Sequence, residues 1–268
     1  SPIIPTCSFN STSIISKAGL QRSVSPLGDQ LLDGFEVFEK NFKDYDYVET
    51  ALQKHLPHGD PDNFNKRYSD APKTCYIVHS TMFLAKLESE FCEIFGNSLE
   101  LINETVISEN HQSIQLQSRK LHFKRLFLFL GAGNKLYDKD PGGRAVVGQY
   151  AEVSTDLGDK GFVRSKGPHN LIYRAMDKTL LVGSLDDKED ELGWPVLGHR
   201  SNRLKSFLTE FDITLSDDLI WQVKSGVRHK GIKRQPFWGE VRPNVFSVHG
   251  LYKNGYTLAF LAAKELLF

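Results

Sequence analysis

The sequence predicts a mixed fold of the α/β or α+β class. Three segments, at residues 26–42, 81–95 and 255–267, place apolar side chains at the spacing of amphipathic helices. Short segments rich in β-branched and aromatic residues lie between these helices and dominate the chain from Ala145 onward. Helices and strands that share one chain in this way indicate a packed sheet with helical cover.

The first elements are a loop and a helix. Residues 8–16 carry many small hydroxyl side chains, which favour a loop with local hydrogen bonds. Ser25 and Pro26 suit the N-cap and the first position of a helix over residues 26–42.

The next segment predicts irregular surface, then a strand and a second helix. Residues 45–72 are polar and rich in Pro, Asp and Asn, so we expect irregular structure with a short helix near 48–55. A strand at 74–78 leads to a helix over 81–95, which Ser80 is expected to cap. Its predicted buried stripe is Phe83, Leu84, Leu87, Phe91 and Ile94, and Gly96 is expected to end it.

Strands follow in the middle of the chain. Residues 104–108 and 113–117 predict two strands joined by a turn. Residues 123–130 are almost all apolar and lead into Gly131-Ala132-Gly133, the profile of a strand buried on both faces of a sheet.

The remaining elements are mainly strands. The sequence predicts strands at residues 145–153, 170–174, 179–184, 219–228 and 245–248, and helices at 199–210 and 255–267. Lys178 is expected in the turn between the second and third of these strands.

Composition excludes several classes of protein. Lys plus Arg and Asp plus Glu both number 33, so the formal net charge is zero, and nucleic acid is an unlikely partner. The chain contains no apolar run long enough for a membrane helix. Three scattered cysteines predict free thiols in a reducing, cytoplasmic setting and no metal site.

Three stretches, in this order, resemble a known family. The first is the Ser11-Thr12-Ser13 loop with the following helix, and the second is the apolar strand that ends in Gly131-Ala132-Gly133. The third is the C-terminal run with Gly226-Val227-Arg228, Arg242-Pro243-Asn244 and Gly255-Tyr256-Thr257. Together they resemble the superfamily of FAD-dependent D-amino-acid oxidase, glycine oxidase and sarcosine oxidase over nearly the whole chain.

The resemblance implies an incomplete FAD-binding, Rossmann-like layer intertwined with a β-rich substrate domain. The FAD-binding part would draw on residues 1–45, 119–145 and 226–268, and the substrate domain on 46–118 and 146–225. It also implies FAD as the cofactor and oxidation of the C–N bond of an amino acid or secondary amine, a small molecule.

One departure from the family concerns the dinucleotide fingerprint. The family begins with a strand, a Gly-x-Gly-x-x-Gly turn and a helix, and the sequence contains no such unit. We therefore expect an N-terminal segment or second chain to carry the fingerprint. The alternatives are a degenerate, non-catalytic scaffold or docking subunit, and a flavoenzyme acting on a modified tRNA base.

The resemblance also assigns substrate residues. Arg228 is expected to bind a substrate carboxylate, since a planar guanidinium suits two-point capture. His229 stands where the family has a proline, so the match at this segment is incomplete. Tyr173, Tyr252 and Tyr150 are candidates for the pocket wall, although strand tyrosines are commonly sheet residues. No catalytic acid or base is assigned, because a neutral amine needs none.

The remaining candidates concern the cofactor. Hydroxyl groups, close backbone approach or helix N–H groups would bring these residues to FAD. They are Ser11, Thr12, Ser13, Gly131, Gly133, Gly250, Gly255, Tyr256 and Thr257. His249 is a possible covalent attachment point for the flavin, but a single histidine beside a turn is more commonly structural.

Overall fold

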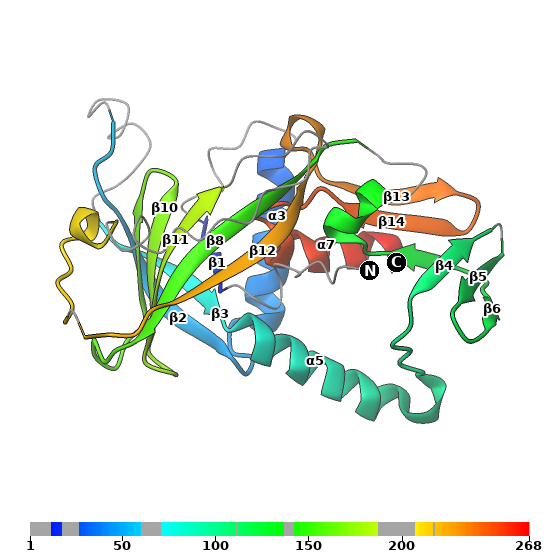
Figure 1. The fold of residues 1–268 in the computed structure, drawn as a ribbon, viewed down its shortest axis with the longest axis horizontal. Helices are drawn as coiled ribbons and strands as arrows, with labels where there is room; N and C mark the ends of the chain where they lie inside the picture. The colour runs from blue at the N-terminus through cyan, green and yellow to red at the C-terminus, as the bar shows by residue number, and fades with distance from the viewer. Residues whose placement is uncertain are drawn as a thin grey trace.

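The described residues of the chain form a mixed α/β structure with one large curled sheet and two small ones (Figure 1). The computed structural model describes residues 12–17, 27–59, 71–110, 112–136, 142–186, 207–216 and 218–267. In the view of Figure 1 the large sheet lies to the left, helices α3 and α7 lie beside it, and α5 runs along the lower edge.

The large sheet has eight strands in the order β1-β3-β2-β9-β10-β11-β8-β12. Its strands are β1 (Ser13–Ile15), β2 (Val48–His55), β3 (Lys73–Val78), β8 (Arg144–Ser154), β9 (Phe162–Lys166), β10 (His169–Arg174), β11 (Thr179–Asp186) and β12 (Gln222–Lys230). The pairs are antiparallel except for β2 with β9, which is parallel. The first and one of the last strands of the chain thus form the two edges of a single sheet.

Helix α3 (Leu27–Phe42) packs on helix α7 (Gly255–Leu267) and confirms the predicted helical periodicity. Leu31, Phe35 and Phe38 of α3 and Leu258 and Leu261 of α7 belong to one buried core. Burying an apolar side chain of this size stabilises the fold by about 1.5–3 kcal/mol. The predicted apolar stripe therefore identifies the face of α3 that meets the core.

The small sheets are β13-β14-β7 and β4-β5-β6. Their strands are β4 (Val106–Glu109), β5 (Ser113–Leu116), β6 (Lys120–His122), β7 (Leu126–Leu128), β13 (Phe237–Arg242) and β14 (Val245–His249). Among the described residues, β7 pairs with β14 alone, in parallel. Phe129 is 66% and Leu130 40% exposed, so the prediction of a long strand buried on both faces is wrong. The described sheet ends at β7, so among the described residues this strand is paired along one edge only.

Residues 48–55 form strand β2, which corrects the short helix expected there. Their backbone pairs with β3 on one side and β9 on the other, and this tertiary pairing overrides a polar, helix-compatible sequence. Ala51 and Gln53 are buried while Glu49 is half-buried beside them.

Helix α5 spans Ser80–Phe95 and ends at Gly96 as expected, where φ is 48°. Ser80 is the first helical residue and His79 takes the N-cap position, so the predicted cap is displaced by one residue. Phe83 is buried, but Phe91 and Ile94 are exposed by 51% and 74%. The predicted stripe therefore exists, and only its first part meets the core.

Of the helix expected at 199–210, only the end lies within the described residues, where Phe207–Phe211 is a 3-10 turn. Three further 3-10 turns are Gly96–Ser98, Gly131–Leu136 and Ile232–Arg234. No helix among the described residues is long and apolar enough to cross a membrane. Cys75 and Cys92 are free thiols, and burial raises the pKa of Cys75 to about 12.

Candidate functional site

A cavity of about 390 Å³ lies between the large sheet and the segment that begins α7. Its walls combine the sheet's first strand, its last strand, helix α3 and the start of helix α7. The lining residues are Thr12, Ser13, Ile14, Ser16, Leu31, Gln53, Gly148, Tyr150, Asn170, Ile172, Leu181, Val182, Gly183, Ser184, Gly226, Arg228 and Tyr252 through Thr257. Polar and apolar groups share this wall, as is usual for a small-molecule site.

Arg228 of β12 lines the cavity, and its side chain lies across the neighbouring strand β8. A Cβ added to Gly148 of β8 would fall within the guanidinium group, 2.7 Å from its Cζ. The Cζ also lies 5.1 Å from the centre of the Tyr252 ring, within cation–π range. Gly148 therefore provides the space, and Tyr252 the aromatic face, that hold the guanidinium over the sheet.

Two lysines strengthen the positive field around the same ring. The ammonium groups of Lys230 and Lys253 each lie 5.5 Å from the Tyr252 ring centre. Lys253 also lines the cavity. Three cations around one aromatic ring favour an anionic group at this end of the cavity.

The start of helix α7 forms a second wall because α3 approaches it closely. A Cβ at Gly34 would clash with the carbonyl of Thr257, 3.1 Å from its carbon atom. The first N–H groups of an α-helix have no partner within the helix, and they carry partial positive charge. A Cβ at Gly255 would meet nothing within 4 Å, so the cavity is open at the helix start.

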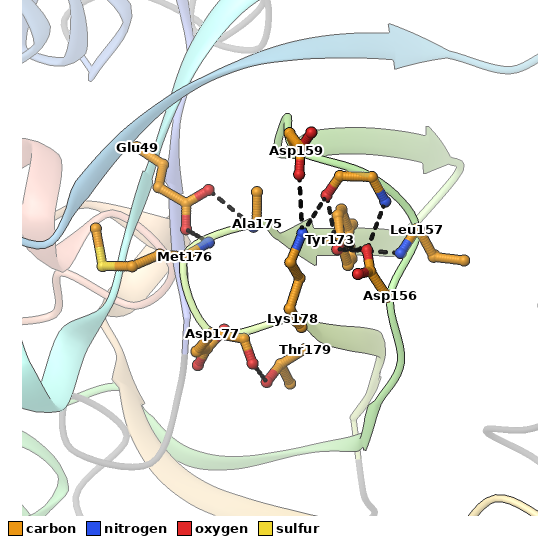
Figure 2. Close-up of polar contacts among 11 residues, drawn as sticks. Glu49, Asp156, Leu157, Asp159, Tyr173, Ala175, Met176, Asp177, Lys178 and Thr179 are labelled. Carbon is orange, nitrogen blue, oxygen red and sulfur yellow. Dashed lines mark hydrogen bonds and ion pairs between the residues drawn. The ribbon is translucent and has the colours of Figure 1, made fainter.

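Thr12 at the entry to β1 is held by a polar network from the β10–β11 turn. Arg174 donates to the Thr12 hydroxyl at 2.8 Å and forms an ion pair with Asp177 at 2.6 Å. Glu49 accepts hydrogen bonds from the backbone N–H groups of Ala175 (2.9 Å) and Met176 (3.1 Å). Figure 2 shows these two bonds between the Glu49 carboxylate and the turn. The turn therefore positions one of the residues predicted to contact the cofactor.

Glu49 is itself paired with a buried histidine. His79 is 3% exposed, and its Nε2 contacts the Glu49 carboxylate. Burial raises the pKa of Glu49, but hydrogen bonds from His79, Met176 and Ala175 outweigh it, and the net pKa lies below its ordinary value. Glu49 is therefore held in its ionised form, in which it binds the turn most strongly.

Tyr150 of β8 lines the cavity, as predicted for a tyrosine at the pocket wall. Burial, followed by the nearby charge of Glu152, raises the pKa of its hydroxyl well above the ordinary value of 10.0. Tyr150 therefore stays neutral and presents a hydroxyl that can donate or accept a hydrogen bond.

The structure brings most of the predicted site residues together. Thr12, Ser13, Arg228, Tyr252, Gly255, Tyr256 and Thr257 all line the cavity. Ser11 lies outside the described residues.

Tyr173 does not reach the cavity, which corrects its expected place in the pocket wall. It is fully buried in the core formed by Leu171 and Leu180 with their neighbours. Its hydroxyl donates to the Gly158 carbonyl at 2.9 Å and accepts from the Leu157 N–H at 3.1 Å (Figure 2). Side chains alternate along β10, so Asn170 and Ile172 face the cavity and Tyr173 faces away.

Three predicted glycines and His249 also lie outside the cavity wall. Gly131 and Gly133 belong to the 3-10 turn after β7. A Cβ at Gly250 would approach the Gln235 carbonyl oxygen to 3.0 Å, so this glycine serves close packing. His249 is buried and stacks on Phe237 with ring centres 4.8 Å apart, in keeping with a structural role.

Sequence reasoning missed Gln53, Gly148 and Asn170. Gln53 lies in the segment that the sequence analysis interpreted as irregular surface, so its position on strand β2 of the large sheet was not predicted. Gly148 interrupts an apolar strand, and a strand-interior glycine commonly marks close approach of another group. That signal was available and would have identified it. Within the described ranges, no group of three or more metal-ligating side chains comes together.

The fold is shared with solved amine and amino-acid oxidases. Glycine oxidase from Geobacillus kaustophilus matches with a TM-score of 0.68 at 13% identity, covering 98% of this chain and 83% of its own. Iminodiacetate oxidase from Chelativorans sp. BNC1 matches with a TM-score of 0.66 at 13% identity, covering 98% and 85%. Fructosyl amine:oxygen oxidoreductase from Aspergillus fumigatus matches with a TM-score of 0.67 at 11% identity, covering 98% and 77%.

The likeness is one of structure. No protein-family model matches the chain, and no curated protein matches it in sequence. The chain therefore has the mixed α/β fold of these oxidases along almost its whole length, as the resemblance implied.

Proposed function

We propose that this chain is an FAD-dependent oxidoreductase that oxidises the C–N bond of an amino acid or secondary amine. The observation that carries the proposal is the cavity, whose wall combines Arg228 with hydroxyl-bearing side chains and the start of helix α7. The fold supports it, since the structural neighbours are oxidases of glycine, iminodiacetate and a fructosyl amine.

The described residues fit a flavin. The hydroxyls of Thr12 and Ser13 can bind polar groups of the cofactor, and the N–H groups at Gly255–Thr257 can bind an electron-rich ring edge. The open space at Gly255 leaves room for close approach. When bound, the flavin supplies a two-electron acceptor for a hydride from the carbon beside the amine.

The chain's own residues bind and orient the substrate. Arg228 pairs with the carboxylate through two parallel hydrogen bonds, while Tyr252 fixes the guanidinium plane. The neutral Tyr150 hydroxyl offers a hydrogen bond nearer the middle of the cavity. Glycine and iminodiacetate, named for two of the structural neighbours, are both amines that carry a carboxylate, which supports this role for Arg228.

We also propose that a segment bearing the dinucleotide fingerprint pairs with the edge of β7 that has no partner strand among the described residues. The β14–β7 pair is parallel, and parallel strands are rarely stable without further strands and cover. Exposed Phe129 and Leu130 follow β7 and would be buried by such a segment. Gly131 and Gly133 would then lie beside it and allow close approach of the cofactor.

The first test is the visible absorption spectrum of the protein purified under native conditions. Flavin bands that carboxylated amines bleach under anaerobic conditions are the expected result. A colourless protein that takes up no FAD, even when an N-terminal fingerprint segment is added, contradicts the proposal and favours the scaffold alternative. Bands that modified tRNA bleaches and amines do not would favour the tRNA alternative.

A further inference from the structure

Three polar side chains form a hydrogen-bonded row at the end of the cavity away from Arg228. The Gln53 Nε2 of β2 donates to the Ser165 Oγ of β9 at 2.9 Å, and this hydroxyl donates to the Asn170 Oδ1 of β10 at 2.6 Å. Gln53 and Ser165 are each 6% exposed, and Gln53 and Asn170 line the cavity. The row therefore crosses three neighbouring strands and has both ends at the cavity wall.

The direction of these bonds determines what each end offers. Ser165 has a single hydroxyl proton, which it donates to Asn170, so it must accept from Gln53. The Gln53 Oε1 is buried and has no hydrogen-bond partner among the residues that the structure describes. The row thus offers a buried acceptor at Gln53 and amide donors at Asn170. A buried polar atom without a partner is rare and calls for an explanation.

The register of the sheet gives the distance from this row to Arg228. Asn170 pairs with Gly183, and Gly183 pairs with Tyr150, two residues from the Gly148 that lies under the guanidinium. Two strand spacings across and two residues along the strand amount to about 12 Å. After a hydrogen-bonded contact at each end, roughly 6 Å remain, about the length of five or six carbon atoms.

The wall between the two ends is lined by Gly183 and Ser184 of β11 and by Tyr150 of β8. Ile172 and Leu181 lie two residues along their strands in the direction away from Gly148, so they flank the row on its other side. A short amino acid held at Arg228 would leave this wall and the polar row uncovered. A substrate with a chain that crosses Gly183 and a polar group at its far end would satisfy all three parts.

We propose that the Gln53–Ser165–Asn170 row is a second binding subsite, which recognises a terminal hydroxyl or amide group on an extended, carboxylate-bearing substrate. The inference rests on the proposed function in that Arg228 binds the carboxylate. A terminal hydroxyl accepts from the Asn170 amide, and its proton supplies the donor that the Gln53 Oε1 lacks once that side chain turns toward the cavity. The row determines which chain lengths and end groups the enzyme accepts.

The test compares two carboxylates that differ only in the terminal hydroxyl, 6-hydroxyhexanoate and hexanoate, with acetate as the short reference. Dissociation constants are measured by calorimetry on the full chain. We expect 6-hydroxyhexanoate to bind roughly 3- to 10-fold more tightly than hexanoate, the effect of a net hydrogen bond. The added hydroxyl is costly to desolvate, so hydrophobic burial alone would give the opposite order.

Two variants isolate the row. Ser165→Ala removes its central hydroxyl with little change in volume, and Gln53→Leu removes the buried acceptor. In both we expect the preference for the hydroxyl to fall to about one, with the affinity for acetate, which does not reach the row, unchanged. Gln112→Leu, at an exposed glutamine outside the cavity, is the control and keeps the preference.

The proposal is overturned by a wild-type preference of one, or by a preference that survives in Ser165→Ala. Should Gln53→Leu fail to fold, Ser165→Ala decides alone. Arg228→Ala separates this proposal from the proposed function, because it should weaken all three acids alike. Unchanged affinities in Arg228→Ala would contradict the assignment of Arg228 as the carboxylate-binding residue. The ratio of the dissociation constants of 6-hydroxyhexanoate and hexanoate tests the Gln53–Ser165–Asn170 row independently of that assignment.

Discussion

Substituting Gly148 by alanine should damage substrate binding without damaging the fold. The added Cβ would lie 2.7 Å from the Arg228 Cζ, whereas carbon atoms in contact sit about 3.5–4.0 Å apart. The guanidinium must therefore retreat by about 1 Å. Because the obstructed group is the end of a flexible side chain, the strain should stay within about 1.5 kcal/mol.

The retreat has a larger effect on function. A displacement of about 1 Å in a positioning group lowers catalysis by up to about 100-fold. Loss of a hydrogen bond to a charged group costs about 1.5–3 kcal/mol, roughly 10- to 150-fold in affinity. We therefore expect Gly148→Ala to lower kcat/KM for a carboxylated amine by about 10- to 100-fold.

The assay is anaerobic flavin reduction with steady-state rates, alongside thermal unfolding of both proteins. Gly239→Ala is the matched control, since its Cβ would meet nothing closer than the Phe237 Cζ at 3.4 Å. The decisive comparison repeats Gly148→Ala in an Arg228→Ala background, where no further loss is expected. An equal loss in that background would refute the reasoning, because the glycine would then act through something other than the guanidinium.

Three further outcomes follow from the same geometry. Arg228→Lys should raise KM for carboxylated amines by roughly 10-fold or more, because an ammonium cannot make two parallel bonds, and an unchanged KM would contradict the assignment. Gly34→Ala should lower the free energy of unfolding by about 1–3 kcal/mol, since its Cβ clashes with the Thr257 carbonyl; urea unfolding measures this, and a neutral result would mean that α3 and α7 separate freely. The pKa of Glu49 is lowered by folding, so its contribution to stability is complete above its ordinary value of 4.5 and is lost as pH falls toward the folded-state value. Glu49→Gln, which breaks the charged pair with His79, should therefore flatten the decline in stability below pH 4.5, and a slope as steep as that of the wild type would show that other groups cause it.

Periodicity in the sequence predicted the helices well, because amphipathic stripes depend on local spacing. Helix α7 has the predicted bounds, Gly255–Leu267, and α3 is helical over Leu27–Phe42, the described part of its predicted range. The sequence analysis predicted a short helix where strand β2 lies. That prediction was wrong because pairing with β3 and β9, which belong to other parts of the chain, decides the conformation of this segment. The apolar stripe on α5 was predicted correctly. Whether such a stripe is buried depends on elements from other parts of the chain, about which the local sequence pattern carries no information.

The candidate site was partly predictable for the same reason. Arg228 and the start of α7 came from motifs whose residues adjoin one another in the chain. Gln53 and Asn170 reach the cavity through strand order alone, and nothing local distinguishes them from other polar strand residues. Tyr173 shows the opposite error, since a register one residue different would have pointed it into the cavity.

The order of the large sheet also governs when the cavity can form during folding. Thr12 hydrogen-bonds to Arg174 across a sequence separation of 162 residues, and the opposite wall begins only at Tyr252. Contacts of such high sequence separation form slowly, because the chain between them must be ordered first. A ligand of the cavity therefore meets a complete binding surface only in the last stage of folding. A bound ligand should slow unfolding and raise the yield of native protein without accelerating the early steps of refolding.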